Sequence, residues 1–175
     1  MLSAYYHRIK KRKAGFAPAK EEEIQQLVEL GKGKLPNEFL EIYKNKMPER
    51  EIEIKDIVIY PMSRIKEENF NYIPGANIYP LGFLTFASTL DGDAICIDLN
   101  DKNGAVYQCS HSLLADGEKI SFYTDKMVSL EFSYENIIRC SVKLANSYME
   151  FAKELRRGKI IAFNVVRFVI DNYEE

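Results

Sequence analysis

Three residues, Cys96, Cys109 and His111, are the only set in the sequence able to supply a nucleophile and its base. A thiol attacks as the thiolate, so a histidine must lie within hydrogen-bond reach of it. Cys109 and His111 are two positions apart on one predicted strand, too far for direct contact, and the register predicted below places Cys96 on the opposite face. We therefore interpret the thiols as buried structural residues and expect His111 to pair with Asp93 across the sheet.

The spacing of the candidate ligand residues does not match that of known metal or phosphate sites. The sequence contains neither a C-x-x-C nor an H-x-x-x-H pattern, and the acids of Asp91–Asp101 lack the ligand spacing of a calcium loop. The run Gly31–Lys34 has no predicted strand before it and lacks the spacing of a P-loop. We therefore predict no catalytic residue, no metal and no cofactor, in a protein that is not an enzyme.

Composition is typical of a folded, water-soluble protein, with 46% apolar and 29% charged residues. Three widely spaced cysteines argue against a disulfide framework and for a reducing compartment. The first residues lack the apolar run of a secretory signal, and no apolar stretch is long enough for a membrane-spanning helix. We expect a cytoplasmic protein.

Charge is divided unevenly along the chain. The whole chain carries −2 and residues 1–20 carry +6, so residues 21–175 carry −8. We interpret residues 1–19 as a basic arm, whose mixture of aromatic and basic side chains is typical of a nucleic-acid or anionic-membrane contact. The residues of that candidate anion contact are Arg8, Lys10, Lys11, Arg12 and Lys13. Because charged termini are more often simply solvated, this contact is kept only as an alternative.

Apolar spacing and helix-ending residues outline the first half of a domain that begins at residue 20. Glutamates in a first turn, glycines after a last turn and the Leu35–Pro36 pair predict two helices. Alternation with period two then predicts strands that Pro61 ends. The predicted elements are helices at 19–30 and 36–45, strands at 52–54 and 57–60, and a single helical turn at 63–68.

The central segment 83–111 predicts a three-stranded antiparallel meander. Asp91–Gly92 is a two-residue hairpin signal, and closing it sets Phe86 opposite Ile97. A second turn sets Ile97 opposite Tyr107. Together the two registers place one apolar set on one face of the sheet: Leu84, Phe86, Ile95, Ile97, Leu99, Tyr107 and Cys109.

The last third of the chain is also predicted to contain both strands and helices. Further strands are predicted at 119–123, 128–132 and 140–145, followed by a helix at 147–157 that Gly158 ends. The tail from about residue 159 is apolar with polar residues at helical spacing, which predicts an added C-terminal helix packed on the body. Its β-branched residues leave a strand as the alternative.

The order and spacing of these elements resemble the SUKH superfamily over about residues 20–157. The resemblance is carried by Leu35–Leu40, Ile59–Ile65, Phe86–Asp98, Val106–Tyr107 with His111, and Asn146–Phe151. The sequence departs from the family pattern at Asn45–Pro48, where the family often has Asn-Gly, in a longer stretch at 112–139, and in the tail after Gly158.

This resemblance implies an α+β fold in a single domain, residues 20–175, with a mostly antiparallel central sheet of about six strands flanked by helices. It also implies a function. Many bacterial members are immunity proteins that bind and neutralise a cognate polymorphic or contact-dependent toxin, and fungal relatives are regulators of cell-wall assembly. The expected partner is therefore a protein toxin, with a nuclease as one candidate.

The acidic balance adds a hypothesis about the contact surface, because an acidic body steers a basic partner towards it. The candidate partner-binding residues, chosen because strand edges and turns expose them, are Glu49, Glu51, Glu53, Asp91, Asp93 and Asp101. Each could equally be an ordinary solvated carboxylate. A regulatory or scaffold module of the same fold is the competing hypothesis.

Overall fold

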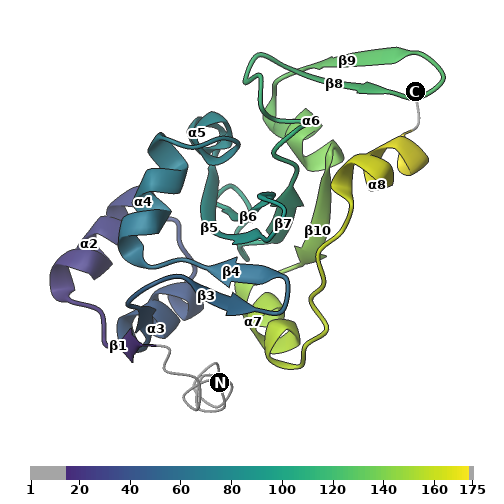
Figure 1. Cartoon of the computed structure of the whole chain (residues 1–175). Helices are drawn as coiled ribbons and strands as arrows, with labels where there is room; N and C mark the ends of the chain where they lie inside the picture. The colour runs from purple at the N-terminus through teal and green to yellow at the C-terminus, as the bar shows by residue number, and fades with distance from the viewer. Residues whose placement is uncertain (1–14, 174–175) are drawn as a thin grey trace.

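A six-stranded antiparallel sheet forms the centre of the domain. The computed structural model describes residues 15–173. The strands follow the order β10-β7-β6-β5-β4-β3 (Figure 1). Their bounds are β3 Ile52–Ile54, β4 Ile57–Ile59, β5 Phe83–Thr89, β6 Ala94–Asp98, β7 Val106–Cys109 and β10 Ser141–Ala145. The predicted fold class, a single α+β domain with a sheet of about six strands, is confirmed.

Helices and two small sheets surround this centre (Figure 1). The helices are α2 Glu21–Leu30, α3 Asn37–Asn45, α4 Met62–Phe70, α5 Gly75–Ile78, α6 Tyr134–Arg139, α7 Tyr148–Arg156 and α8 Val165–Asn172, with a 3-10 turn η2 at Tyr79–Leu81. The small sheets pair β1 Phe16–Ala17 with β2 Met47–Pro48, and β8 Lys119–Tyr123 with β9 Met127–Glu131. The predicted C-terminal helix is present only from Val165, because residues 159–164 run in irregular conformation.

Apolar side chains fill both faces of the sheet, and β5 is buried at all of its positions. On one face the rings of Phe39, Phe86 and Tyr148 meet edge to face, with centroids 4.5–5.6 Å apart. On the other face Phe83 and Tyr107 lie in a second cluster with the helices α5, α6 and α8. A sheet covered on both sides loses the alternation of apolar and polar residues from which register is read.

The β5–β6 register differs from the prediction. Ile97 pairs with Leu84 and not with Phe86, which is left unpaired where the register shifts. The turn contains three residues and not two, because the Thr89 N–H donates to the Asp93 carbonyl (2.9 Å). An unpaired residue in one strand acts as a β-bulge, which keeps Leu84 and Phe86 in the same core cluster despite the shift.

The β6–β7 register is displaced by one residue from the prediction. Ile97 pairs with Val106, so Tyr107 falls opposite Cys96. A displacement of one residue turns every side chain of a strand to the other face. The prediction that Cys96 and Cys109 lie on opposite faces is therefore wrong, and their sulfur atoms are 3.3 Å apart in the second core cluster.

Candidate partner-binding surface

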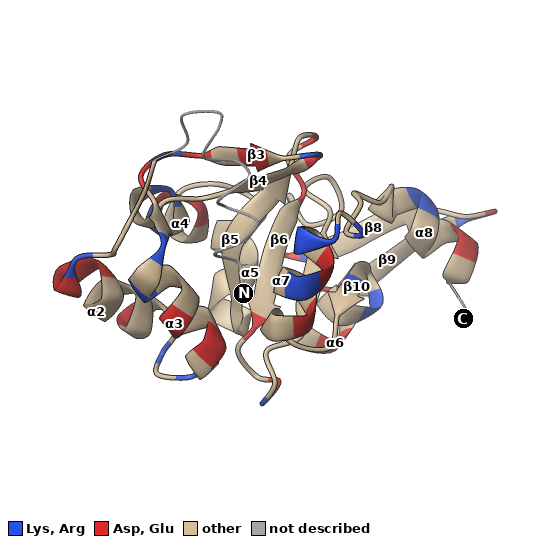
Figure 2. Ribbon diagram, turned by 90° about the horizontal axis from the view of Figure 1, so that it is seen from below, with Lys and Arg blue, Asp and Glu red and all other residues tan. Residues whose placement is uncertain are grey.

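The predicted acidic contacts divide between two ends of the sheet. Asp91 lies in the β5–β6 turn, whereas Asp101 follows β6 at the opposite end of that strand. Three further candidates lie on or just before β3, where Figure 2 shows acidic positions, and they are Glu49, Glu51 and Glu53. Glu51 and the residues on either side of Asp91 line one cavity, so this end of the sheet gathers most of the candidate set.

Asp93 is engaged inside the protein. Its side chain is only 11% exposed, and its carboxylate accepts hydrogen bonds from Gln108 Nε2 (2.9 Å) and from the His111 backbone N–H (3.0 Å). His111 Nδ1 lies 2.9 Å from the same carboxylate, which confirms the predicted polar pairing. Because its oxygens already have partners, we leave Asp93 out of the contact surface proposed below.

Helix α4 is fixed to the sheet by one buried amide. Asn69 Nδ2 donates to the carbonyls of Ile65 and Thr85, both at 2.7 Å, and Asn69 Oδ1 accepts the Thr85 N–H at 2.9 Å. The side chain therefore pairs with Thr85 as a strand would, just beyond the end of β4. Together with the core packing of Met62 and Ile65, this arrangement positions the residues that α4 presents to solvent.

Arg64 is the centre of the polar network on α4. Its Nη2 lies 2.6 Å from Glu68 and its Nε lies 3.4 Å from Glu51, the latter without hydrogen-bond geometry. The guanidinium also lies over the ring of Tyr72, 4.5 Å from the centroid, and 5.6 Å from that of Tyr60. Glu67 approaches the guanidinium at 3.5 Å, so two rings and three carboxylates hold one cation at the surface.

Burial shapes the protonation of this network. Burial raises the pKa of Glu68, although Arg64 and the Tyr60 hydroxyl both favour its charged form. Burial also raises the pKa of Tyr60 to about 12, against a hydrogen bond from Ser88 that lowers it. Burial opposes the charge of Arg64, but Glu68 and Tyr72 together raise the pKa of the guanidinium above its ordinary value. Arg64 therefore stays positive and Tyr60 neutral near pH 7.

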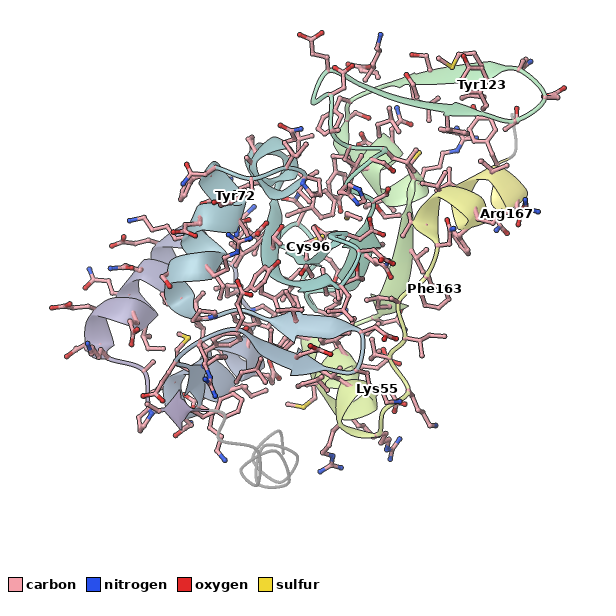
Figure 3. The ribbon with its side chains drawn as sticks, in the orientation of Figure 1. Lys55, Tyr72, Cys96, Tyr123, Phe163 and Arg167 are labelled. Carbon is pink, nitrogen blue, oxygen red and sulfur yellow. The ribbon has the colours of Figure 1, made fainter. Side chains whose placement is uncertain are left out.

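A cavity of about 310 Å³ opens between α4, β4 and the β5–β6 turn. Its walls include Glu51, Tyr60, Arg64, Glu68, Tyr72 and Ser88. At its edge Tyr72, Ile73 and Leu90 are 46%, 53% and 57% exposed. We call the set Glu51, Arg64, Tyr72, Ile73 and Leu90 the α4–hairpin surface. Figure 3 labels Tyr72 near the end of α4.

The residue types of the α4–hairpin surface are those that dominate protein interfaces. Tyrosine and arginine are enriched among the residues that carry most of the binding energy, and exposed apolar side chains gathered in one place mark interaction sites. Phe70, which is also exposed, packs edge to face on Tyr79 and lines a different cavity. The arrangement is suited to binding another protein.

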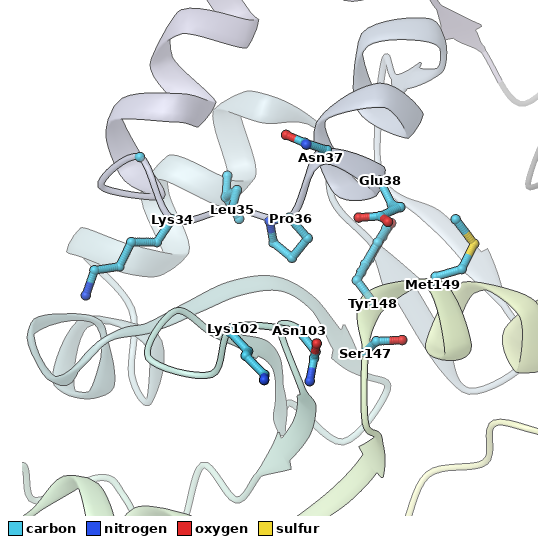
Figure 4. A pocket seen from close by; sticks show the side chains of 11 residues that line it. Lys34, Leu35, Pro36, Asn37, Glu38, Lys102, Asn103, Ser147, Tyr148 and Met149 are labelled. Carbon is cyan, nitrogen blue, oxygen red and sulfur yellow. The ribbon is translucent and has the colours of Figure 1, made fainter.

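A second cavity, of about 380 Å³, lies between the beginnings of α3 and α7 (Figure 4). Lys34, Lys102 and Glu38 give its walls charges of both signs, and Tyr148 beneath it is buried. None of the large apolar side chains exposed within residues 15–173 lines this cavity. We therefore regard the α4–hairpin surface as the better candidate for a protein contact.

The remaining predicted chemistry is placed as follows. Cys96, Cys109 and Cys140 are all buried. Burial raises the pKa of Cys96 and raises that of Cys140 to about 11.

In the part of the chain that the structure describes, no three His, Cys, Asp or Glu side chains gather closely enough to hold a metal ion. No helix there is long and apolar enough to cross a membrane. The basic arm residues lie outside the described residues: Arg8, Lys10, Lys11, Arg12 and Lys13.

The family model of the SMI1/KNR4 family (SUKH-1) matches residues 18–129, more than half of the chain. The chain belongs to the SMI1/KNR4 family. The predicted SUKH superfamily is thereby confirmed, and members of this family are protein-interaction modules. The match includes β3, α4 and the β5–β6 turn, and therefore the whole α4–hairpin surface. It ends within β9, before α6, β10, α7 and α8. Neither a curated protein nor a solved structure matches the chain.

Sequence reasoning missed the large apolar residues of the α4–hairpin surface. The charge argument selects Glu51, but none of the sequence patterns described above selects Tyr72, Ile73 or Leu90. One signal was available: two large apolar residues stand one position beyond a polar helix and directly precede Pro74, where the chain cannot continue as a strand.

Proposed function

We propose that this SMI1/KNR4-family protein is an immunity protein, which binds a cognate bacterial toxin in the cytoplasm and blocks it without catalysis. Membership of a family of protein-interaction modules supports a binding role. The observation that carries the proposal is the α4–hairpin surface, where exposed apolar side chains surround an arginine fixed between two tyrosine rings.

Rigidity of the α4–hairpin surface favours tight binding. Asn69 fixes α4 to β5, and the ion pair with Glu68 fixes Arg64, so the Arg64 side chain has little freedom left to lose when a partner docks. Association is opposed by the ordering of mobile side chains, and a preorganised surface avoids much of that cost.

Charge supports the choice of a basic toxin. Glu51 belongs to the surface, Glu53 lies on the same sheet face as the cavity residues Val58 and Ser88, and the chain from residue 21 onward carries −8. A toxin that acts on nucleic acid must be basic where it contacts phosphates, and an acidic inhibitor accelerates the encounter with such a protein. We therefore propose a nuclease as the toxin.

Two alternatives remain. A regulatory module of the same fold would use the same surface on a resident cellular protein. Association of the basic arm with nucleic acid or an anionic membrane stays a prediction, and deletion of residues 1–15 would abolish binding to oligonucleotides or anionic liposomes if it holds.

The deciding experiment is co-expression with the toxin encoded beside this gene. We expect the chain to restore growth, and we expect a Y72S/L90S double variant to lose that protection. The matched control is Y123S/M127S, which alters an exposed tyrosine and an exposed, flexible apolar residue paired across the β8–β9 hairpin. Figure 3 shows Tyr123 on that hairpin, far from Tyr72. A chain that protects against no neighbouring toxin, while binding a resident protein, would support the regulatory module.

A further inference from the structure

We propose that the α4–hairpin surface recognises an arginine side chain of its partner, flanked by aliphatic residues, and seats that arginine in the 310 Å³ cavity against Glu51. The inference rests on the proposed function, since it names the chemistry by which that surface would select a toxin.

The first reason is the balance of charge around the cavity. Within residues 15–173, Arg64 is the only cation among the cavity's walls, and Glu51 and Glu68 face it. Glu67 approaches the same guanidinium at 3.5 Å from the exposed side of α4. Three carboxylates therefore share one positive charge, and a second cation would find an attractive field at the mouth of the cavity.

The second reason is that Glu51 is only loosely engaged. Glu68 takes the short contact with Arg64, at 2.6 Å, and is itself buried. Glu51 stands 3.4 Å from Arg64 Nε, which finds no hydrogen-bond partner within residues 15–173. With its side chain 53% exposed, Glu51 retains the oxygen lone pairs needed to accept two parallel N–H bonds from a guanidinium.

The neighbouring residues favour arginine over lysine. Cross-strand pairing places Glu53, Val58 and Ser88 on one face of the sheet, and Val58 and Ser88 line the cavity beside the ring of Tyr72. A flat guanidinium can stack along such aromatic and aliphatic walls while its edge pairs with a carboxylate, whereas a compact, strongly hydrated ammonium cannot.

The apolar residues at the edge of the cavity determine which residues of the partner would flank its arginine. Ile73 and Leu90 are each more than half exposed and stand on the two elements that border the cavity, the α4–α5 connection and the β5–β6 turn. Aliphatic residues next to the inserted arginine would cover them and exclude water from the ion pair, which strengthens it.

The test uses the full chain and a tripeptide probe. Acetyl-Leu-Arg-Leu-amide is titrated while amide resonances are followed by NMR, alongside the same peptide with citrulline, a neutral isostere of arginine. We expect saturable shifts at Glu51, Ser88 and Leu90, and about tenfold weaker binding of the citrulline peptide. Glu51→Gln should weaken the arginine peptide to a similar extent. Glu135→Gln, the same change at an exposed position on α6, should leave it unaltered.

Shifts confined to another region, equal binding of the citrulline peptide, or equal binding of a lysine peptide would overturn the inference. The outcome is separable from that of the proposed function. If the chain neutralises its toxin through Tyr72 and Leu90 but the arginine peptide fails, only the arginine assignment is wrong. If the peptide binds but no toxin is neutralised, the cavity chemistry stands and the immunity role does not.

Discussion

Replacement of Asn69 by alanine tests whether a single side chain fixes α4 to the sheet. Asn69 is 1% exposed and makes three hydrogen bonds, two of them to the backbone of Thr85. Beyond the end of β4, this amide occupies the place that a neighbouring strand would take. Asn69→Ala removes it and brings no replacement for either backbone group of Thr85.

The expected loss can be worked from these contacts. Each buried backbone group left without a partner costs about 1–3 kcal/mol, and in Thr85 both the N–H and the C=O would lose their partner. The bond to the Ile65 carbonyl adds less, because that carbonyl also lies within the hydrogen-bonding pattern of α4. We therefore expect Asn69→Ala to lower the free energy of unfolding by about 4 kcal/mol.

The assay is equilibrium unfolding in urea followed by circular dichroism. The midpoint should fall while the slope m is retained, which marks a change in stability and not in the surface exposed on unfolding. Asn71→Ala is the matched control, because Asn71 is exposed one position beyond the end of α4, and it should change stability by about 0.5 kcal/mol or less. A loss of less than about 1 kcal/mol for Asn69→Ala would refute the reasoning.

Three other perturbations follow from the same structure. Thr85→Val should raise the free energy of unfolding by about 1 kcal/mol, because within residues 15–173 the buried Thr85 hydroxyl has no hydrogen-bond partner. Urea unfolding measures this change, and a clear loss of stability would contradict the expectation. Gly104→Ala should destabilise more than Gly33→Ala in thermal unfolding: both have positive φ, but a Cβ on Gly104 would meet Pro36 at 2.5 Å, whereas one on Gly33 meets open space. Burial raises the pKa of Glu68, so the folded state binds its proton more tightly than the unfolded state. The stability of the wild type relative to Glu68→Gln should therefore fall as pH rises from 4.5 through that raised pKa, and urea midpoints showing the opposite trend would mean a lowered pKa.

Elements were predictable where local chemistry specifies them. Acidic residues at the start of α2 allow Glu23 to accept the Lys20 N–H at 2.8 Å, and Ser147 caps α7 by accepting the Glu150 N–H at 3.1 Å. Such signals lie within a few residues of each other, so the sequence displays them directly.

Register and exposure were not predictable in the same way. Both faces of β6 and β7 are buried, so an apolar residue at Val106 or at Tyr107 satisfies the pattern equally well, and the strand pairing was displaced by one residue. The α4–hairpin surface depends on which apolar residues stay uncovered. Tyr72 and Leu90 are far apart in the sequence, and only the packing of α4 beside the β5–β6 turn places them at one cavity.

The central proposal is that this SMI1/KNR4-family protein blocks a toxin through the α4–hairpin surface. The most direct measurement is the dissociation constant of the purified chain with that toxin, for wild type, Y72S/L90S and Y123S/M127S. Two residues at the centre of an interface contribute about 2 kcal/mol each or more, so Y72S/L90S should bind about a thousandfold more weakly while Y123S/M127S binds as the wild type does. Equal affinity for wild type and Y72S/L90S, or a loss confined to Y123S/M127S, would contradict the account.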